Sequence, residues 1–135
     1  RCLVMEYIED GCRVDDLVAL RRMGVEPRAV SDRLTKAYSE MIFGHGFVHC
    51  DPHPGNILVT KEGGGFSLVL LDHGLYRELA DDFRVSYARL WKALVDGDER
   101  VIAAQSTALG APDAHRLFSA ILTQRPWDRV TRRRL

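Results

Sequence analysis

The chain has 135 residues, and 46% of them are hydrophobic, which is enough to bury the core of one domain. Its 19 basic and 19 acidic residues cancel, so no overall field favours nucleic acid or an anionic membrane as a partner. The 3 cysteines lack metal-ligand spacing and predict reduced thiols, not a disulfide framework. No apolar run approaches the roughly 20 residues of a membrane-spanning helix.

The two ends of the sequence carry separate expectations. The chain starts at Arg1, inside a strand-like run and without an initiator methionine, so we expect a piece of a longer protein. At the other end, Arg129 and residues 132–134 form a basic cluster. We expect this cluster to be solvated, because chain ends are rarely packed.

The first third of the chain predicts a strand and then two helices. Residues 2–5 are apolar and run into an acidic turn, as a short buried strand would. A short helix is expected over residues 15–22, with Gly24 as its stop. From Pro27 to Gly44, apolar residues recur every three or four positions. That stripe predicts a helix that is central to the core.

Two apolar runs in the middle of the chain, residues 57–60 and 66–71, predict a pair of strands. Three consecutive glycines lie in the link between the runs, which favours a hairpin. Antiparallel pairing would bring Asn56, just before the first strand, close to Asp72, just after the second.

Three more helices are predicted in the last third. The first carries a stripe from Phe83 to Leu94 and ends at Gly97. Asp98 caps the second, which stops at Gly110. The third starts at Pro112 and is ended by Pro126 and Trp127, with four residues facing inward: Leu117, Phe118, Ile121 and Leu122. The predicted fold class is therefore α+β, a mostly helical body with one small β-hairpin.

Residues 49–56 hold most of the chemically active side chains. They read His-Cys-Asp-Pro-His-Pro-Gly-Asn, and the two prolines exclude a helix or central strand, which leaves a stiff loop. The spacing of Asp51 and Asn56, followed by an Asp-x-Gly turn at Asp72, is typical of phosphoryl-transfer enzymes. Asp51 suits the orientation of an accepting group, and Asn56 and Asp72 suit the ligation of Mg²⁺.

Other interpretations of this loop stay open. Aspartate and asparagine also suit an ordinary turn. The side chains of His49, Asp51 and His53, with Asp72 and His73 beyond, could instead form a metal-dependent hydrolase site for Zn²⁺ or Mn²⁺. The two prolines restrict their convergence on a metal. His49 is more simply expected to hydrogen-bond the backbone and stiffen the loop.

Residues 49–56, followed by Leu-Asp-His-Gly at residues 71–74, resemble the UbiB or aarF-domain-containing (ADCK-type) atypical kinases. Residues 70–76 and 125–127 look most like the mitochondrial branch of that family. The resemblance covers nearly the whole chain. It implies a single partial domain over residues 1–135, the C-terminal lobe of a protein-kinase-like domain. The hinge would lie at about residues 3–11, with the N-terminal lobe absent from the chain.

The same resemblance implies roles for individual residues. Asp51 matches the catalytic-loop aspartate, and His53 stands where protein kinases carry a catalytic lysine. Asn56 and Asp72 match the metal ligands, and Asn56 also contacts the bound cofactor. The hinge residues that would meet the adenine are Met5, Glu6 and Tyr7.

The implied cofactors are ATP and Mg²⁺, and the implied activity is that of a kinase or ATPase linked to coenzyme Q biosynthesis and mitochondrial lipid homeostasis. Cys50 replaces the arginine that would pair with a phosphorylated activation loop, and little chain separates Gly74 from the helix near Asp81. A small-molecule or lipid acceptor is therefore favoured over a protein.

We also expect a mitochondrial location, membrane association only through parts outside this chain, and no nucleic-acid partner. The isolated chain should be marginally stable and without measurable ATPase activity. A non-catalytic pseudokinase interaction module remains as a further alternative.

Overall fold

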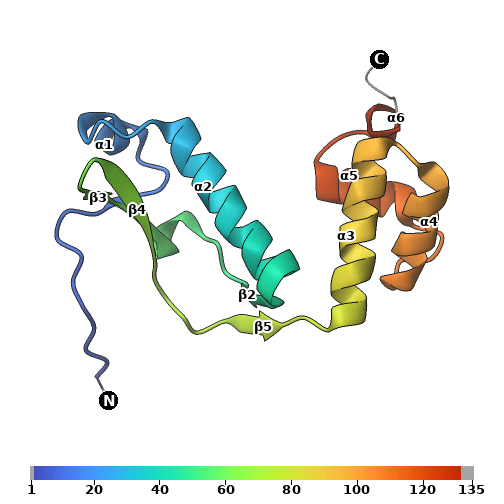
Figure 1. Ribbon diagram of the computed structural model, residues 1–135, viewed down its shortest axis with the longest axis horizontal. Helices are drawn as coiled ribbons and strands as arrows, with labels where there is room; N and C mark the ends of the chain where they lie inside the picture. Colours follow the sequence, from blue (N-terminus) through green and yellow to red (C-terminus); the bar gives the residue numbers. More distant parts are fainter. Residues whose placement is uncertain (1, 132–135) are drawn as a thin grey trace. The chain divides into compact units, whose positions relative to one another are not determined.

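The computed structural model describes residues 2–131, so residues 132–134 of the basic cluster lie outside the described part. The chain divides into two compact units, Arg1–Glu78 and Leu79–Leu135. The first mixes helices with small antiparallel sheets, whereas the second is helical throughout its described residues (Figure 1). The α+β class is thereby confirmed. None of the described helices combines the length and the apolarity that crossing a membrane requires.

The first unit contains short strands, two α-helices and two other helical turns. In chain order these are β1 (Cys12–Arg13), α1 (Leu17–Arg22), α2 (Pro27–Ser39), the π-helical turn η1 (Glu40–His45), β2 (Phe47–His49), the 3₁₀ turn η2 (Pro54–Asn56), β3 (Ile57–Glu62), β4 (Gly65–Leu70) and β5 (Tyr76–Glu78).

The predicted hairpin is confirmed as β3 and β4, which pair antiparallel with Ile57 opposite Leu70. Gly63 begins the turn with φ +52°, a conformation that glycine adopts without strain. On its other edge β3 pairs with β1, and Cys12 lies opposite Val59. Both edges of β3 are thus occupied, and the sheet order is β1-β3-β4.

The core of this unit is built from α1, the segment after it and β3. Leu20, Val25 and Val59 are buried there together with Val30, the one buried residue of α2. The remainder of the α2 stripe is half-buried, so the prediction that this helix is central to the core is wrong. Instead α2 lies at the margin of the core, where the Arg33 guanidinium stacks 4.0 Å from the Phe66 ring centroid.

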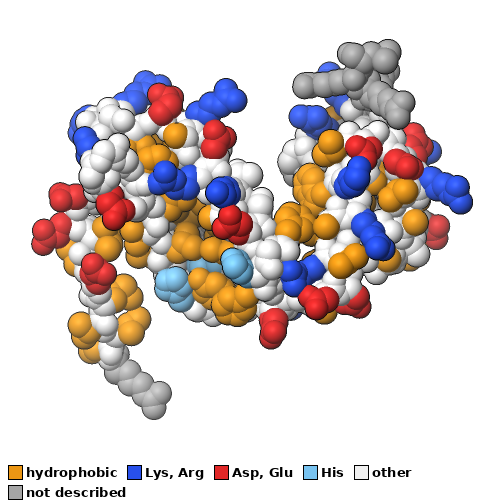
Figure 2. Space-filling model, viewed as in Figure 1, with side chains coloured by type: hydrophobic (Ala, Val, Ile, Leu, Met, Phe, Trp, Pro, Cys, Tyr) orange, Lys and Arg blue, Asp and Glu red, His pale blue; other side chains and the backbone are white. Residues whose placement is uncertain are grey.

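The strand predicted over residues 2–5 is also wrong. These residues form no strand, and the side chains of Leu3, Val4 and Met5 are 81%, 91% and 65% exposed. A strand requires a neighbour for its backbone hydrogen bonds, and no strand of the described sheets pairs with these residues. Figure 2 shows hydrophobic side chains standing out along the N-terminal segment. The acidic turn that follows, at Glu9 and Asp10, is confirmed.

The second unit contains the predicted helices, as α3 (Asp81–Asp96), α4 (Glu99–Ala108) and α5 (His115–Thr123), and a short α6 (Trp127–Val130). Its buried cluster consists of Leu90, Ala93, Leu94, Ile102 and Val130. The predicted helix ends are confirmed here. Gly97 closes α3 with φ +72°, and the Asp98 carboxylate caps α4 by accepting a hydrogen bond from the Val101 N–H at 3.1 Å.

Several details of α5 differ from the prediction, the first being that the helix begins at His115 and not at Pro112. Leu117 and Ile121 are 65% and 57% exposed, whereas Ser119 is fully buried. Residues four apart share one helix face, and that face of α5 is turned away from the cluster on which Phe118 and Leu122 pack. In addition, α5 ends at a left-handed Gln124, and Pro126 begins α6 rather than ending α5.

Candidate nucleotide and metal site

His49 fastens the polar loop to the end of the hairpin. Its side chain is 1% exposed. The ring Nδ1 accepts a hydrogen bond from the Asp51 N–H at 3.1 Å, and Nε2 lies 3.3 Å from the Leu71 carbonyl oxygen. Because Nδ1 accepts, the neutral ring carries its hydrogen on Nε2 and donates it to Leu71. The expected backbone role of His49 is confirmed.

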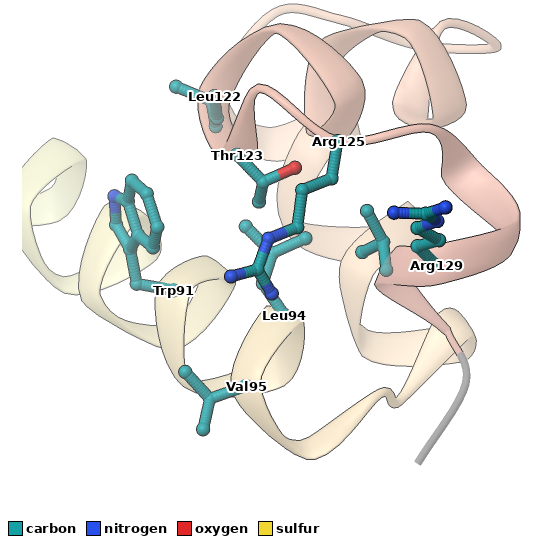
Figure 3. Close-up of a pocket in the computed structure, with 8 residues that line it drawn as sticks. Trp91, Leu94, Val95, Leu122, Thr123, Arg125 and Arg129 are labelled. Atoms are coloured by element: carbon teal, nitrogen blue, oxygen red, sulfur yellow. The ribbon is translucent and has the colours of Figure 1, made fainter. Parts of the chain in front are cut away.

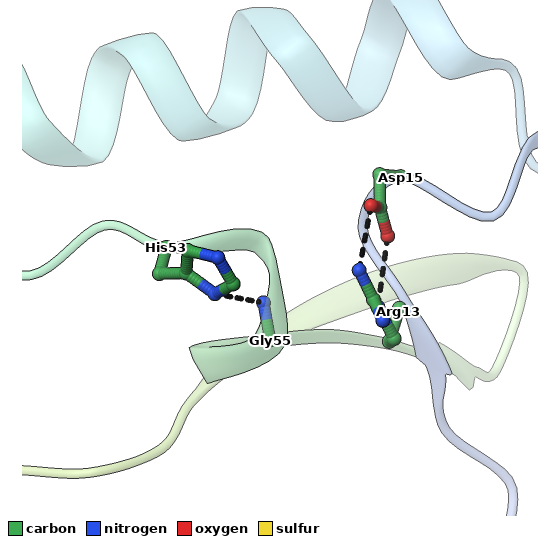
Figure 4. A network of polar contacts seen from close by, with 4 residues as sticks. All are labelled: Arg13, Asp15, His53 and Gly55. Carbon is green, nitrogen blue, oxygen red and sulfur yellow. Dashed lines mark hydrogen bonds and ion pairs between the residues drawn. The ribbon is translucent and has the colours of Figure 1, made fainter.

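His53 shapes the second half of the loop. Its Nδ1 accepts a hydrogen bond from the Gly55 N–H at 3.1 Å and so caps the 3₁₀ turn η2 (Figure 4). The neighbouring ion pair in that view joins Arg13 to Asp15 at 2.7 Å, and the Arg13 hydrogen bond is the largest cause of the lowered pKa of the Asp15 carboxyl. With Nδ1 occupied, the exposed His53 ring keeps Nε2 for another partner.

The Asp51 and Asn56 side chains are in direct contact. The Asn56 amide Nδ2 donates to the Asp51 carboxylate at 3.1 Å, which leaves the Asn56 Oδ1 atom able to bind a cation. The Asn56 carbonyl oxygen accepts from the Leu71 N–H at 2.7 Å, one residue before Asp72. The hairpin therefore joins the two halves of the motif through the backbone, as its pairing predicts.

Asp72 occupies a sharp turn after β4. It has φ +54°, a region in which aspartate and asparagine are enriched among residues other than glycine. Its Oδ1 accepts a hydrogen bond from the Gly74 N–H at 3.3 Å. The side chain is exposed, and among the described residues its second carboxylate oxygen has no hydrogen-bond partner.

An aromatic group that the sequence did not predict supports this turn. His73 Nδ1 lies 2.8 Å from the Tyr76 hydroxyl, and the Tyr76 ring stacks on Phe47 with a centroid distance of 4.8 Å. Tyr76 begins β5, which pairs with β2. The chain thus returns to the loop two residues after Gly74. The segment Tyr-Arg-Glu has one apolar residue, so no periodicity marks it as a strand.

A cavity of about 720 Å³ adjoins Asp72. Met5 and Glu6, two of the predicted adenine-binding residues, line it together with the end of β4 and residues 72–74. The third, Tyr7, lines a neighbouring cavity with Thr60 and Lys61. Asp51 and Asn56 line neither of them. The structure therefore places Met5, Glu6 and Asp72 around one cavity and Asp51, His53 and Asn56 within the loop, whereas Tyr7 lies outside both groups.

The donor atoms of these groups suit Mg²⁺, which prefers one or two carboxylates with further oxygen ligands. The Oδ1 of Asn56 and the exposed carboxylate of Asp72 are such ligands. The structure disfavours the metal-dependent hydrolase interpretation. Both ring nitrogens of His49 and the Nδ1 of His53 already form hydrogen bonds with the protein backbone, so they are not open to a metal ion. Among the described residues, no three His, Cys, Asp or Glu side chains converge closely enough to hold a metal.

A stiff Asp-Asn loop joined through a hairpin to an Asp-x-Gly turn, within an α+β chain, is the motif arrangement of a kinase-like protein. Residues 1–106 match the ABC1 atypical kinase-like domain, so the chain belongs to that family.

Relatives from distant organisms share most of the chain. It is 47% identical over 134 residues, 98% of its length, to AarF domain-containing protein kinase 1 of Gallus gallus. It is 47% identical over 132 residues, 96% of its length, to AarF domain-containing kinase 1 of Drosophila melanogaster. The identity is 39% over 131 residues, 95% of its length, to probable serine/threonine-protein kinase abkD of Dictyostelium discoideum. The chain spans 26%, 25% and 19% of these relatives. No solved structure matches it.

Proposed function

We propose that the protein containing this chain is an ATP- and Mg²⁺-dependent atypical kinase or ATPase, and that these residues form its kinase-like C-terminal lobe. The observation that carries this proposal is the bonded set of Asp51, Asn56 and Leu71. That set links the Asp-x-x-x-x-Asn loop to the Asp-x-Gly turn. Kinase names among the relatives support the same class of activity.

The hydrogen bonds of the loop residues favour a different role for each of them. Bound Mg²⁺ would neutralise the charge of the transferring phosphoryl group, and Asn56 Oδ1 and the Asp72 carboxylate would hold it. The amide of Asn56 orients the Asp51 carboxylate. That carboxylate can accept further hydrogen bonds, so it suits the removal of a proton from the hydroxyl group or water that receives the phosphoryl group. His53, with Nδ1 fixed on Gly55, offers its Nε2–H to a phosphate oxygen.

The cavity beside Asp72 suits the nucleoside part of ATP. Its volume of about 720 Å³ lies within the range of small-molecule sites. Met5 and Leu3 supply apolar surface for a purine, and their exposure leaves that surface open to a ligand. Tyr7 lies outside this cavity, and we place it at the rim of the adenine site.

For the acceptor, we propose a small molecule or lipid over a protein. β5 follows Gly74 almost at once, so the segment has no length for an activation loop that docks a peptide. Cys50 stands in place of a phosphate-binding arginine. We extend the proposal to a mitochondrial location, a link to coenzyme Q and lipid homeostasis, and membrane association through other parts of the protein.

The test is ATP turnover by the full-length protein with Asp51→Asn. Turnover should depend on Mg²⁺ and should fall by roughly 10²–10⁴-fold in the variant, while nucleotide affinity stays the same. Asp32→Asn, an exposed change on α2, is the matched control and should have no effect. Unchanged turnover would remove Asp51 from the chemistry. A protein that does not bind ATP at all would be a non-catalytic interaction module.

A further inference from the structure

A second cavity lies within the helical unit and shares no residue with the candidate nucleotide site. Its volume is about 420 Å³, also within the range of small-molecule sites. Trp91, Leu94 and Val95 of α3 form one wall, and the end of α5 forms another. Figure 3 shows Arg125 extending from the segment after α5 towards Trp91 and Leu94, with Arg129 on α6 beside it.

The lining combines apolar surface with unpaired positive charge. Val95 is 83% exposed although it is a large aliphatic residue, and Trp91 offers an aromatic face. The guanidinium groups of Arg125 and Arg129 form no hydrogen bond or ion pair with another described residue. None of the lining residues is acidic, and Asp96, on the same helix, is paired with Lys92 at 2.5 Å. Within the part of the chain that the structure describes, the cavity therefore presents two guanidinium groups without a partner next to a hydrophobic wall.

The backbone holds both arginines in place. Arg125 lies between Gln124, which has φ +52°, and Pro126, which has φ −58° and restricts the residue before it. Arg129 belongs to α6, which is anchored by the buried Val130. Both arginines are thus attached to a backbone of restricted conformation, which lowers the entropy that binding would cost.

We propose that this cavity binds a small organic anion that has an aliphatic or aromatic body and a single carboxylate or phosphate group. Guanidinium groups bind both of these anions through paired N–H···O hydrogen bonds. The body of the ligand would lie against Trp91, Leu94 and Val95, which removes that apolar surface from water. This binding site is independent of the proposed kinase chemistry.

Calorimetric titration of the full-length protein tests the ligand class with four probes. Octanoate and octyl phosphate, used below their micelle concentrations, should bind at one site, and the tighter of the two identifies the preferred head group. Octyltrimethylammonium has the same body with the opposite charge and should not bind. Inorganic phosphate has no body and should bind more weakly than octyl phosphate. Absence of octanoate and octyl phosphate binding, or equal binding of the ammonium probe, overturns the proposal.

Two pairs of variants locate the site. Arg125→Gln combined with Arg129→Gln should weaken anion binding by roughly tenfold or more, whereas Arg100→Gln, an exposed change on α4, should not. Val95→Glu should also abolish binding, because it places a negative charge at the cavity. Val85→Glu, at an exposed position on the same helix outside the cavity, should leave it intact. Equal effects within either pair would show that the anions bind elsewhere.

Discussion

At the scale of single residues, His49 organises the candidate site. Its two ring nitrogens bind the Asp51 N–H and the Leu71 carbonyl oxygen, so one buried side chain fixes both the loop and the end of β4. His49 therefore holds the backbone of Asp51, and Asn56 holds its carboxylate.

His49→Ala should uncouple the loop from the hairpin. The change leaves two part-buried backbone groups without this partner and removes a buried ring, which destabilises the fold by about 1–3 kcal/mol. Thermal melting should show the loss of stability, and ATP turnover by the full-length protein should fall with it. His45→Ala, an exposed change in η1, serves as the control. Wild-type stability and turnover in His49→Ala would contradict this role.

Tyr38 differs from His49 because its buried polar group does not stabilise the fold at neutral pH. Its hydroxyl is buried and has no hydrogen-bond partner among the described residues. Burial raises the pKa of the Tyr38 hydroxyl, and nearby Tyr76, Asp51 and Cys50 add to the shift. The folded chain therefore holds this proton more tightly than the unfolded chain does.

Tyr38→Phe should melt at the same temperature as the wild type, or higher, at neutral pH, because a buried hydroxyl without a partner is unfavourable. Ionisation of the buried Tyr38 hydroxyl destabilises the folded chain: this penalty is absent below the ordinary tyrosine pKa of about 10 and develops as the pH rises through the raised value. The variant should lack this alkaline loss. Melting curves from pH 8 to pH 11 would show it, and Tyr7→Phe, at an exposed tyrosine, should behave as the wild type. A lower melting temperature for Tyr38→Phe at neutral pH would refute the assignment.

At the scale of elements, two helix ends that look alike in the sequence differ in their surroundings. Gly24 and Gly97 both end helices with positive φ, +70° and +72°. A Cβ on Gly24 would meet no atom within 4 Å, whereas a Cβ on Gly97 would lie 3.3 Å from the Thr131 carbonyl oxygen. The end of α3 is therefore packed against the chain just after α6.

Gly97→Ala should destabilise the fold more than Gly24→Ala does. Both changes place a side chain in the left-handed region, at a penalty of about 1–2 kcal/mol. Only Gly97→Ala adds the close approach to Thr131. The measurement is the free energy of unfolding of the two variants in urea. Equal losses would mean that the chain after α6 does not press against Gly97.

The elements that the sequence predicted well are those marked by strong local signals. Glycines after α1 and α3, the Asp98 cap and the glycine-rich link of the hairpin each act within a few residues. β1 and β5 were missed because two or three residues carry no periodicity, and their pairing depends on distant strands. The same holds at the site, where the hairpin predicted that Asn56 lies close to the Asp72 turn, but the spacing did not predict the hydrogen bond between Asp51 and Asn56.

At the scale of the whole molecule, the N-terminal segment contributes little to stability and offers much surface. Leu3 and Val4 are 81% and 91% exposed. Leu3→Glu with Val4→Glu should therefore leave the melting temperature of this chain unchanged and should reduce its aggregation, because it removes exposed apolar surface. Light scattering and thermal melting test both points. Val30→Glu, in the core, should unfold the chain. A large drop in melting temperature for the N-terminal pair would show that the segment is packed.

We propose that Asp72 holds the metal of a bound nucleotide, and titration of ATP into the full-length protein measures this directly. Asp113 is a matched control, because it is also an exposed aspartate with positive φ, +59° against +54° for Asp72. Asparagine tolerates that conformation, so both substitutions preserve the backbone. Mg²⁺ should tighten ATP binding in the wild type and in Asp113→Asn, and should have no effect in Asp72→Asn. Mg²⁺-dependent ATP binding in Asp72→Asn equal to that of the wild type would contradict the account.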